Sequence, residues 1–182
     1  MHPAFYIRPA RVEEAAALSD LCFRSKAVWG YDPEFMALML AALGVAGEDI
    51  AAGDVGRDRG RRAGVVALAP GDAPGALDLN KLFIEPRHIR SGVGRALLAH
   101  AIAEARRRGA GRLTILADPN AAAWLRSRQL PGETARQLPD LSTIIRVEPS
   151  HTDDSRLQGA LPTADVPILK LHEKSELVGC AP

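Results

Sequence analysis

The feature that most constrains this chain is a strand, a glycine-containing turn, a helix and a second strand within residues 76–117. ALDLNKLFI at 76–84 predicts a strand, GRALLAHAIAEARRR predicts a helix that ends at Gly109, and RLTILA at 112–117 predicts the next strand. Two neighbouring strands joined through a helix are expected to lie parallel, with a right-handed connection. The segment therefore predicts a sheet that contains at least one parallel pair.

The rest of the chain continues this mixture of strands and helices. Strands are predicted at 5–8, 64–69, 141–147 and 166–171, and helices after Pro9, from Pro33 to Gly44 and from Pro119. An aspartate stands directly before Pro33 and before Pro119, which is the pattern of a capped helix start. Only a weak strand is predicted within 48–62, and 148–163 is a long loop. The pattern predicts an α/β (mixed α+β) fold with helices packed on a sheet.

The chain is long enough for one substantial core without disulfides or a structural metal. A domain near 182 residues buries roughly 70 % of the surface that its unfolded chain exposes. Cys22 and Cys180 form no C-x-x-C pair, and Cys22 has the helical spacing of a small core residue. We expect one domain over residues 1–172 and a flexible tail at 173–182.

Charge and hydropathy argue against several classes of protein. The 23 Lys plus Arg and 22 Asp plus Glu give a formal charge of +1, which disfavours a protein that coats nucleic acid or an anionic membrane. No stretch approaches the ~18 uninterrupted apolar residues of a membrane span, and the N-terminus lacks a signal pattern. His88, His100 and His151 have no metal-site spacing. The composition predicts a cytoplasmic protein without a metal.

The turn before the central helix predicts a site for an anion. IRSGVGRALL places Gly92 and Gly94 at the helix N-terminus, where backbone N–H groups lack intrahelical partners and the helix dipole is positive. Arg90 and Arg95 add charge, and residues 87–112 hold seven Arg and one Glu, a formal charge of +6. A tight turn whose glycines only satisfy its conformation is the simpler alternative.

Two common phosphate-binding motifs are excluded at this turn. A Walker-type loop needs Gly-Lys-Ser/Thr, whereas Gly94 is followed by Arg-Ala. A dinucleotide fingerprint needs Gly or Ala where Leu97 stands, and it needs its glycines directly after the strand. Seven residues separate Ile84 from Gly92. The predicted anion site is therefore of another kind.

Five segments in order resemble a known family. They are L-F-I-E-P, x-x-G-x-G-R-A-L-L, a helix ending in A-R-R-R-G, L-T-I-L-A and D-P-N-A. With the opening strand and the helix pair around SKAVWGYD, they resemble the GNAT superfamily of acyl-CoA-dependent N-acetyltransferases over about residues 5–130. The resemblance implies a central mixed sheet with flanking helices, in which two splayed parallel strands bind coenzyme A.

The resemblance also implies which residues bind acetyl-CoA. The strand before the turn offers backbone groups to the pantetheine arm, the turn amides hold the pyrophosphate, and an Asn that opens the next helix contacts the arm. The implied positions are Leu82, Phe83, Ile84, Arg90, Ser91, Gly92, Val93, Gly94, Arg95 and Asn120. For Asn120, a capping or turn role is an equal alternative.

The chain departs from the family pattern at two positions. Ile89 stands where Gln or Arg is usual, a change that leaves backbone binding intact. Leu125, after Trp124, stands where a Tyr usually acts as general acid toward the thiolate leaving group. Because Leu cannot donate a proton, the reaction requires a substitute donor, a water or release of free thiolate, and a thiol of pKa ~8.5 is already a fair leaving group.

Acetyl transfer to an amine needs proximity, an oxyanion donor and a means of keeping the amine neutral. A backbone N–H near Ile84 is the expected oxyanion donor. Asp78 is the expected general base, acting through a water, and Asn80 is a substrate candidate, because the two residues alternate with Leu79 along the strand. An ordinary strand-edge carboxylate is an equal alternative for Asp78.

The loop between the first two helices contains the remaining candidates. The resemblance places Trp29 and Tyr31 in the wall of the acceptor pocket, where aromatic rings hold an alkyl chain or a cation. Tyr31 is also the best remaining phenol to replace the missing Tyr. Asp32 is better explained as a helix cap than as a partner of the amine.

The sequence therefore predicts an acyltransferase that moves an acetyl group directly from acetyl-CoA to a primary amine. The expected acceptor is a small molecule, with a peptide amine as a second choice, and a homodimer is compatible with this function. A CoA- or acyl-CoA-binding module with little or no catalysis stays open because of Leu125 and Ile89. An interaction subunit whose basic turn binds another anion or RNA is the third alternative.

Overall fold

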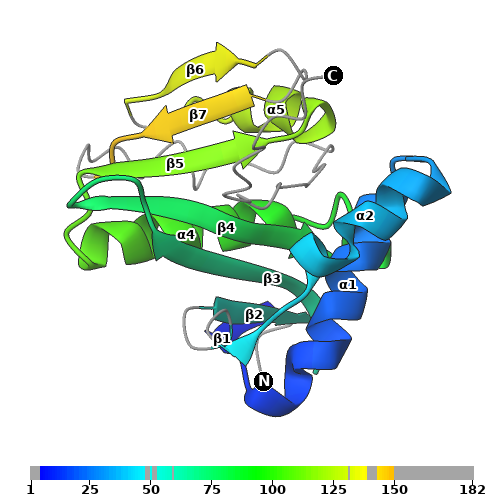
Figure 1. The fold of residues 1–182 in the computed structure, drawn as a ribbon. Coiled ribbons are helices and arrows are strands. Elements are labelled where there is room, and N and C mark those ends of the chain that lie inside the picture. The colour runs from blue at the N-terminus through cyan, green and yellow to red at the C-terminus, as the bar shows by residue number, and fades with distance from the viewer. Residues whose placement is uncertain are drawn as a thin grey trace.

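A computed structural model describes residues 5–47, 50, 53–58, 60–130, 132–138 and 143–149. The elements in chain order are β1 (Phe5–Pro9), η1 (Val12–Glu14), α1 (Ala15–Ala27), α2 (Pro33–Leu43), β2 (Gly53–Asp58), β3 (Arg61–Pro70), β4 (Ala76–Ile84), η2 (Pro86–His88), α4 (Val93–Arg107), β5 (Arg112–Ala117), α5 (Pro119–Arg126), β6 (Thr134–Gln137) and β7 (Thr143–Val147) (Figure 1). The predicted strands at 76–84 and 112–117 are confirmed at both ends.

The strands form one seven-stranded mixed sheet in the order β1-β2-β3-β4-β5-β7-β6. Neighbouring strands are antiparallel except β4 and β5, which are parallel and joined through α4 as predicted. The paired register of β4 and β5 covers only three positions, from Ala76 opposite Arg112 to Asp78 opposite Thr114. Beyond Asp78 the two strands separate, although β4 continues to Ile84. This separation is the splay that the resemblance implied.

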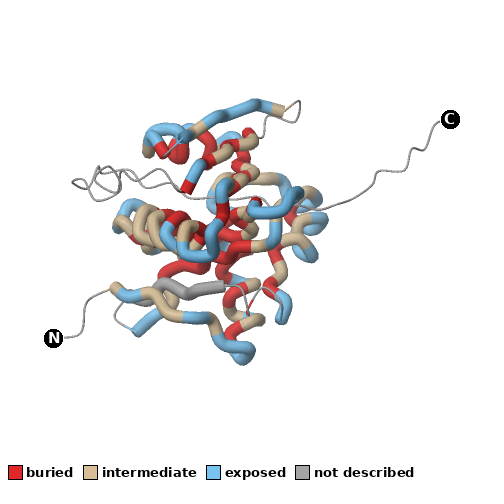
Figure 2. The backbone as a smooth tube through the Cα atoms, turned by 90° about the vertical axis from the view of Figure 1, so that its left-hand side faces the viewer, coloured by how far each residue is buried: buried red, intermediate tan, exposed pale blue. Residues whose placement is uncertain are grey.

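The helices pack around the middle of the sheet. Figure 1 shows α4 running behind β3 and β4, and α1 and α2 at the end of the sheet where β4 stops. The apolar half of α4 is buried, and α1 contacts β4 while α5 contacts β5 and β7. Figure 2 shows the buried positions concentrated in the centre of the molecule, and all four residues of the outer strand β6 are exposed. Cys22 is fully buried in this core, as predicted.

Local sequence signals explain the helix starts. Asp32 and Asp118 accept hydrogen bonds from the backbone N–H groups of Phe35 (2.8 Å) and Ala121 (2.9 Å). Each is therefore an N-cap with proline at the first helical position, which confirms the predicted caps. Among the described residues, no helix is both long enough and apolar enough to cross a membrane.

Two strands differ from the sequence expectation. The weak strand predicted within 48–62 is a full partner of β1 and β3. The strand β6 was not predicted, because all four of its residues are exposed and it lacks an alternating apolar pattern. The predicted strand at 166–171, the tail at 173–182 and most of the loop at 148–163 lie outside the described residues.

Candidate active site

The candidate site lies where β4 and β5 separate, and a β-bulge marks the place. In the register of β3 with β4, Ala67 is opposite Lys81 and Leu68 is opposite Leu79, so Asn80 is an extra residue on β4. Bulges bend a strand and redirect its side chains, and they occur often beside active sites. The bulge stands two residues beyond Asp78, the last β4 residue paired with β5.

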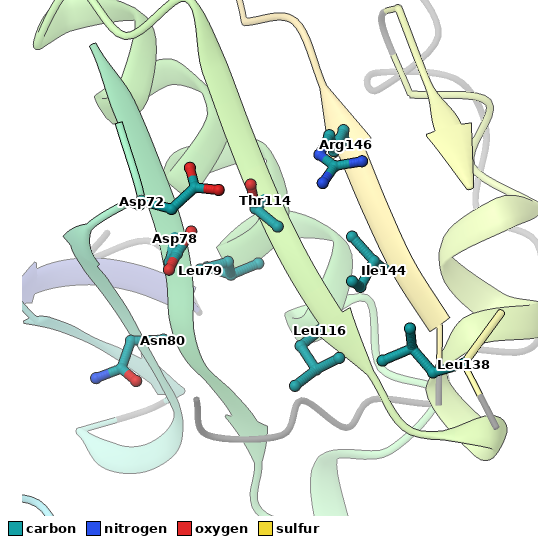
Figure 3. A pocket seen from close by; sticks show the side chains of 9 residues that line it. All are labelled: Asp72, Asp78, Leu79, Asn80, Thr114, Leu116, Leu138, Ile144 and Arg146. Carbon is teal, nitrogen blue, oxygen red and sulfur yellow. The ribbon is translucent and has the colours of Figure 1, made fainter. Parts of the chain in front are cut away.

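A cavity of about 180 Å³ lies over this point of separation. Figure 3 shows its lining: Asp72, Asp78, Leu79, Asn80, Thr114, Leu116, Leu138, Ile144 and Arg146. Asp78 and Asn80, which the sequence placed on one side of the strand, both line it. The sequence analysis did not anticipate Arg146 or the three apolar residues from β5, β7 and the segment after β6. Apolar and polar residues alternate in RLTILA and in TIIRV, so each segment is recognisable as a strand. The sequence does not indicate that these two strands are neighbours in the sheet.

The glycine turn lies at the start of α4, as predicted. Gly92 is the residue before the helix and has a left-handed backbone, with φ 86°, and Arg90 also has a positive φ of 67°. The Ser91 hydroxyl donates to the His88 carbonyl (2.6 Å), which ties the turn to η2. Strained backbone conformations of this kind cluster at ligand sites, and the first helical N–H groups point outward from the helix start. The turn has the form of an anion cradle.

The basic charge of residues 87–112 is divided between the two ends of α4. Arg107 and Arg108 form ion pairs with Glu104 at the helix C-terminus, and Arg112 pairs with Asp72. A helix of 15 residues is about 22 Å long, so these arginines are remote from the turn. The expectation of a strongly basic turn is therefore corrected: the charge near it comes from the arginines at 87, 90 and 95.

The end of β4 is buried, and one of its amides is already used. The Ile84 N–H donates to the Ser25 hydroxyl of α1 (3.2 Å), while the next N–H, that of Glu85, bonds to Ala63 on β3. The Ile84 N–H is therefore occupied, and the oxyanion donor expected near Ile84 has to be another N–H of this strand. Because hydrogen-bonding direction alternates along a strand, the Leu82 N–H points to the same side as that of Ile84, toward the separated edge.

Tyr31 belongs to a partly buried polar cluster rather than to the lining of the cavity. Its hydroxyl accepts a hydrogen bond from Asn120 Nδ2 (3.2 Å), and Lys26 Nζ lies 4.6 Å from the centre of its ring. Lys26 also donates to Asp118 (2.7 Å), and both of these side chains are buried. The cluster joins the loop after α1 to the start of α5. It brings together two sequence candidates, Tyr31 and Asn120.

The environment of Tyr31 keeps its phenol protonated. Burial, then the negative charge of Asp118 and a hydrogen bond with it, raise the pKa of Tyr31 above its ordinary value, and the hydrogen bond from Asn120 opposes this only in part. Leu125, where the family pattern has Tyr, is fully buried in the core. Trp29 is half-buried and packs against the core, and it does not line the cavity with Asp78. Neither Trp29 nor Tyr31 is among the residues that line this cavity, and their expected place in the wall of an acceptor pocket stays a prediction.

Lys26 was missed by the sequence analysis, although a signal was present. It follows Leu18, Leu21 and Cys22 at helical spacing, so a lysine occupies a position on the buried face of α1. A lysine at such a position requires a buried partner, and Asp118 is that partner. Within the part of the chain that the structure describes, no three His, Cys, Asp or Glu side chains lie close enough to hold a metal ion.

Comparisons with known proteins agree with this geometry. The sequence profile of the Acetyltransferase (GNAT) family matches residues 17–125, which include most of α1, the glycine turn and most of α5. No curated protein matches the chain in sequence.

Solved structures share the fold at low sequence identity. PaiA N-acetyltransferase from Thermoplasma acidophilum, in complex with coenzyme A, is 12% identical with a TM-score of 0.68, over 80% of this chain and 99% of that one. The ribosomal-protein-S18-alanine N-acetyltransferase from Escherichia coli is 20% identical with a TM-score of 0.58, over 82% and 97%. A GNAT family acetyltransferase from Brucella melitensis, in complex with acetyl-CoA, is 19% identical with a TM-score of 0.57, over 94% and 97%. These likenesses establish the fold.

Proposed function

The chain belongs to the acetyltransferase (GNAT) family, and we propose that it transfers an acetyl group from acetyl-CoA to the primary amine of a small molecule. The observation that carries the proposal is the position of the glycine turn beside the separated edges of β4 and β5. An anion cradle and an unpaired strand edge suit a ligand with a pyrophosphate and an extended amide-containing arm.

The residues present fit coenzyme A. The N–H groups of Gly92, Val93 and Gly94 would hold the pyrophosphate, and Arg90 and Arg95 would add positive charge. The outward carbonyl groups of Leu82 and Ile84 on the open edge of β4 would accept from the amides of the arm, and Asn120 would approach it from the start of α5. Bound acetyl-CoA supplies a thioester carbonyl for attack by the amine.

The cavity residues supply the base. An amine must be neutral to attack, and a carboxylate within reach accepts its proton. Asp78 lines the cavity directly at the end of the paired register, and Asp72 lines it too but forms an ion pair with Arg112. We therefore retain Asp78 as the base, acting through a water, and Asn80 as a hydrogen-bonding partner of the acceptor.

Tyr31 is the proposed proton donor. Its raised pKa keeps the proton in place near neutral pH, and its hydroxyl lies against Asn120, the residue proposed to touch the arm. A phenol that accepts from Asn120 has one O–H to donate, and a hydrogen bond with Asp118 helps to keep that proton on the oxygen until the leaving thiolate takes it. For the oxyanion, the Leu82 N–H replaces the Ile84 N–H, which Ser25 occupies.

Thermal unfolding with coenzyme A tests the cofactor half of the proposal. A ligand at a hundredfold its Kd adds roughly 2.7 kcal/mol of stability. We expect Gly92→Glu to abolish this effect. Gly109→Glu is the matched control, because Gly109 also has a positive φ (72°), has open space around its Cα, and stands at the other end of α4. A wild-type protein that coenzyme A does not stabilise contradicts the proposal.

Thiol release across a panel of amines tests the catalytic half. We expect Asp78→Asn to reduce turnover and to leave coenzyme A binding unchanged, while Asp72→Asn retains turnover. Full turnover in Asp78→Asn would remove this residue as the base.

A coenzyme A-binding module without catalysis is the second candidate, favoured by the buried Leu125 in place of the usual acid. Binding without thiol release for any amine would select it. The cytoplasmic location and the homodimer remain predictions from the sequence.

A further inference from the structure

The geometry points to an acceptor of a particular chemical class: a small amine that also carries a carboxylate and an apolar group, as apolar amino acids do. We infer that Arg146 is the residue that selects it. The inference rests on the proposed function, since it names the acceptor for that site.

Three polar side chains lie in one row across three strands of the sheet. Asp78 on β4 is opposite Thr114 on β5, and Thr114 is opposite Arg146 on β7. Neighbouring strands are about 4.8 Å apart, so the backbones of Asp78 and Arg146 are separated by about 10 Å. All three residues line the cavity, and Figure 3 shows Arg146 and the aspartates on opposite sides of Thr114. The row thus holds an acidic group at one end and a basic group at the other.

The side chain of Arg146 has no partner among the other described residues. It makes no hydrogen bond or ion pair with any of them, whereas Arg112 pairs with Asp72 and Arg107 pairs with Glu104. Arg146 is half-buried and lines the cavity. A guanidinium in such a place binds a carboxylate through two parallel hydrogen bonds. A carboxylate on the ligand is therefore the group that suits Arg146 in this cavity.

Two residues further along β5 and β7, the side chains on the same face of the sheet are apolar. Leu116 on β5 is opposite Ile144 on β7, and both line the cavity together with Leu138. An acceptor with its amine toward Asp78 and its carboxylate toward Arg146 would place its side chain against these residues. The cavity volume of about 180 Å³ is below the roughly 300–1,000 Å³ of pockets for drug-sized ligands, which favours a small acceptor.

The same row argues against acceptors with a second positive charge. A diamine that offers one amine to Asp78 would place its other ammonium near Arg146, and like charges repel in a partly buried cavity. An amino amide has the amine but lacks the negative charge for Arg146. This arrangement therefore predicts that the protein binds an amino acid more tightly than the corresponding amino amide and more tightly than a diamine.

Titration calorimetry with three probes tests the inference: L-leucine, L-leucinamide and 1,5-diaminopentane, each with and without coenzyme A. We expect L-leucine to bind at least tenfold more tightly than either other probe. Arg146→Gln should abolish this preference, and Arg146→Lys, which keeps the charge but not the planar fork, should restore part of it. Arg126→Gln, an exposed arginine on α5, is the control and should leave it unchanged. Unfolding midpoints establish that the variants are folded.

Kinetics give a second readout if the protein acetylates L-leucine. Loss of a group that only binds the acceptor raises KM and leaves kcat nearly unchanged, and this is the pattern expected for Arg146→Gln. A variant that loses kcat alone would contradict the assigned role.

The outcomes separate the inference from the proposed function. Equal binding of the acid and the amide, preference for the diamine, a preference that survives Arg146→Gln, or no binding of any probe overturns the inference. Preferential binding of L-leucine supports it even if coenzyme A does not bind, a result that would overturn the proposed function alone. Acetylation of amines without preference for the carboxylate would overturn only the inference.

Discussion

Lys26 Nζ lies 2.7 Å from Asp118 Oδ2, and the two side chains are only 2% and 4% exposed. This buried ion pair joins α1 to the first turn of α5 across 92 residues of sequence. Asp118 also caps α5 through the Ala121 N–H, and Lys26 lies over the ring of Tyr31. The pair therefore fixes the relative position of Tyr31 and Asn120, the proposed proton donor and the proposed contact to the cofactor arm.

Removal of one partner of this pair should be strongly destabilising. Lys26→Met leaves the Asp118 carboxylate buried without its cation, which costs about 3–5 kcal/mol in comparable pairs. The double variant Lys26→Met, Asp118→Asn removes the charge and keeps a capping side chain, so it should recover more than half of the loss. Urea unfolding at neutral pH measures both. A loss below about 1 kcal/mol in Lys26→Met would show that the pair is not needed for folding.

Tyr31→Phe tests the proton donor directly. The substitution removes only the hydroxyl, so the ring stays over Lys26 and the variant should remain folded. General acid catalysis contributes typically 10²- to 10⁴-fold, and we expect kcat to fall by about a hundredfold while coenzyme A binding is retained. Tyr6→Phe, at an exposed position of β1, is the control. An unchanged kcat would assign the leaving thiolate to water or to release without a proton.

The sequence predicted the fold wherever the signal was local. The strands at 76–84 and 112–117, the turn at Gly92 and the two capped helices depend on neighbours along the chain, and each has the predicted bounds or conformation. The contacts that build the site connect distant segments. The row from Asp78 through Thr114 to Arg146 depends on strand order and register, and the Asn80 bulge breaks the simple alternation. No local pattern specifies those relationships.

Gly64 determines how closely α4 approaches the sheet. A methyl group added there would lie 2.7 Å from Leu97 Cδ1 on α4 and 2.7 Å from the Phe83 carbonyl on β4. Gly64→Ala should therefore force the helix away and destabilise the protein by about 1–3 kcal/mol. Gly111→Ala is the matched control, since no heavy atom lies within 4 Å of the added group, and it should change stability by less than about 0.5 kcal/mol. Equal unfolding free energies for the two variants would contradict this packing.

Glu104, which lies far from the site, should make the free energy of unfolding depend on pH. The hydrogen bond from Arg107 has the largest effect on the pKa of Glu104, and together with the hydrogen bond from Arg108 it lowers this pKa to about 2. Burial opposes the shift only in part. A carboxyl group with a lowered pKa in the folded state stabilises the protein above its ordinary pKa of 4.5, and this stabilisation is lost as pH falls from there through about 2.

Glu104→Gln should accordingly lower the free energy of unfolding at pH 7, and this difference should shrink steadily below pH 4.5 to a small remainder at pH 2. The arginines are solvent-exposed, so the difference at pH 7 should stay below about 1 kcal/mol and should shrink in high salt. Urea unfolding of both proteins between pH 7 and pH 2 measures it, with Glu13→Gln on η1 as the control. A difference that persists undiminished at pH 2, or that grows as pH falls, would contradict the ionic origin of the effect.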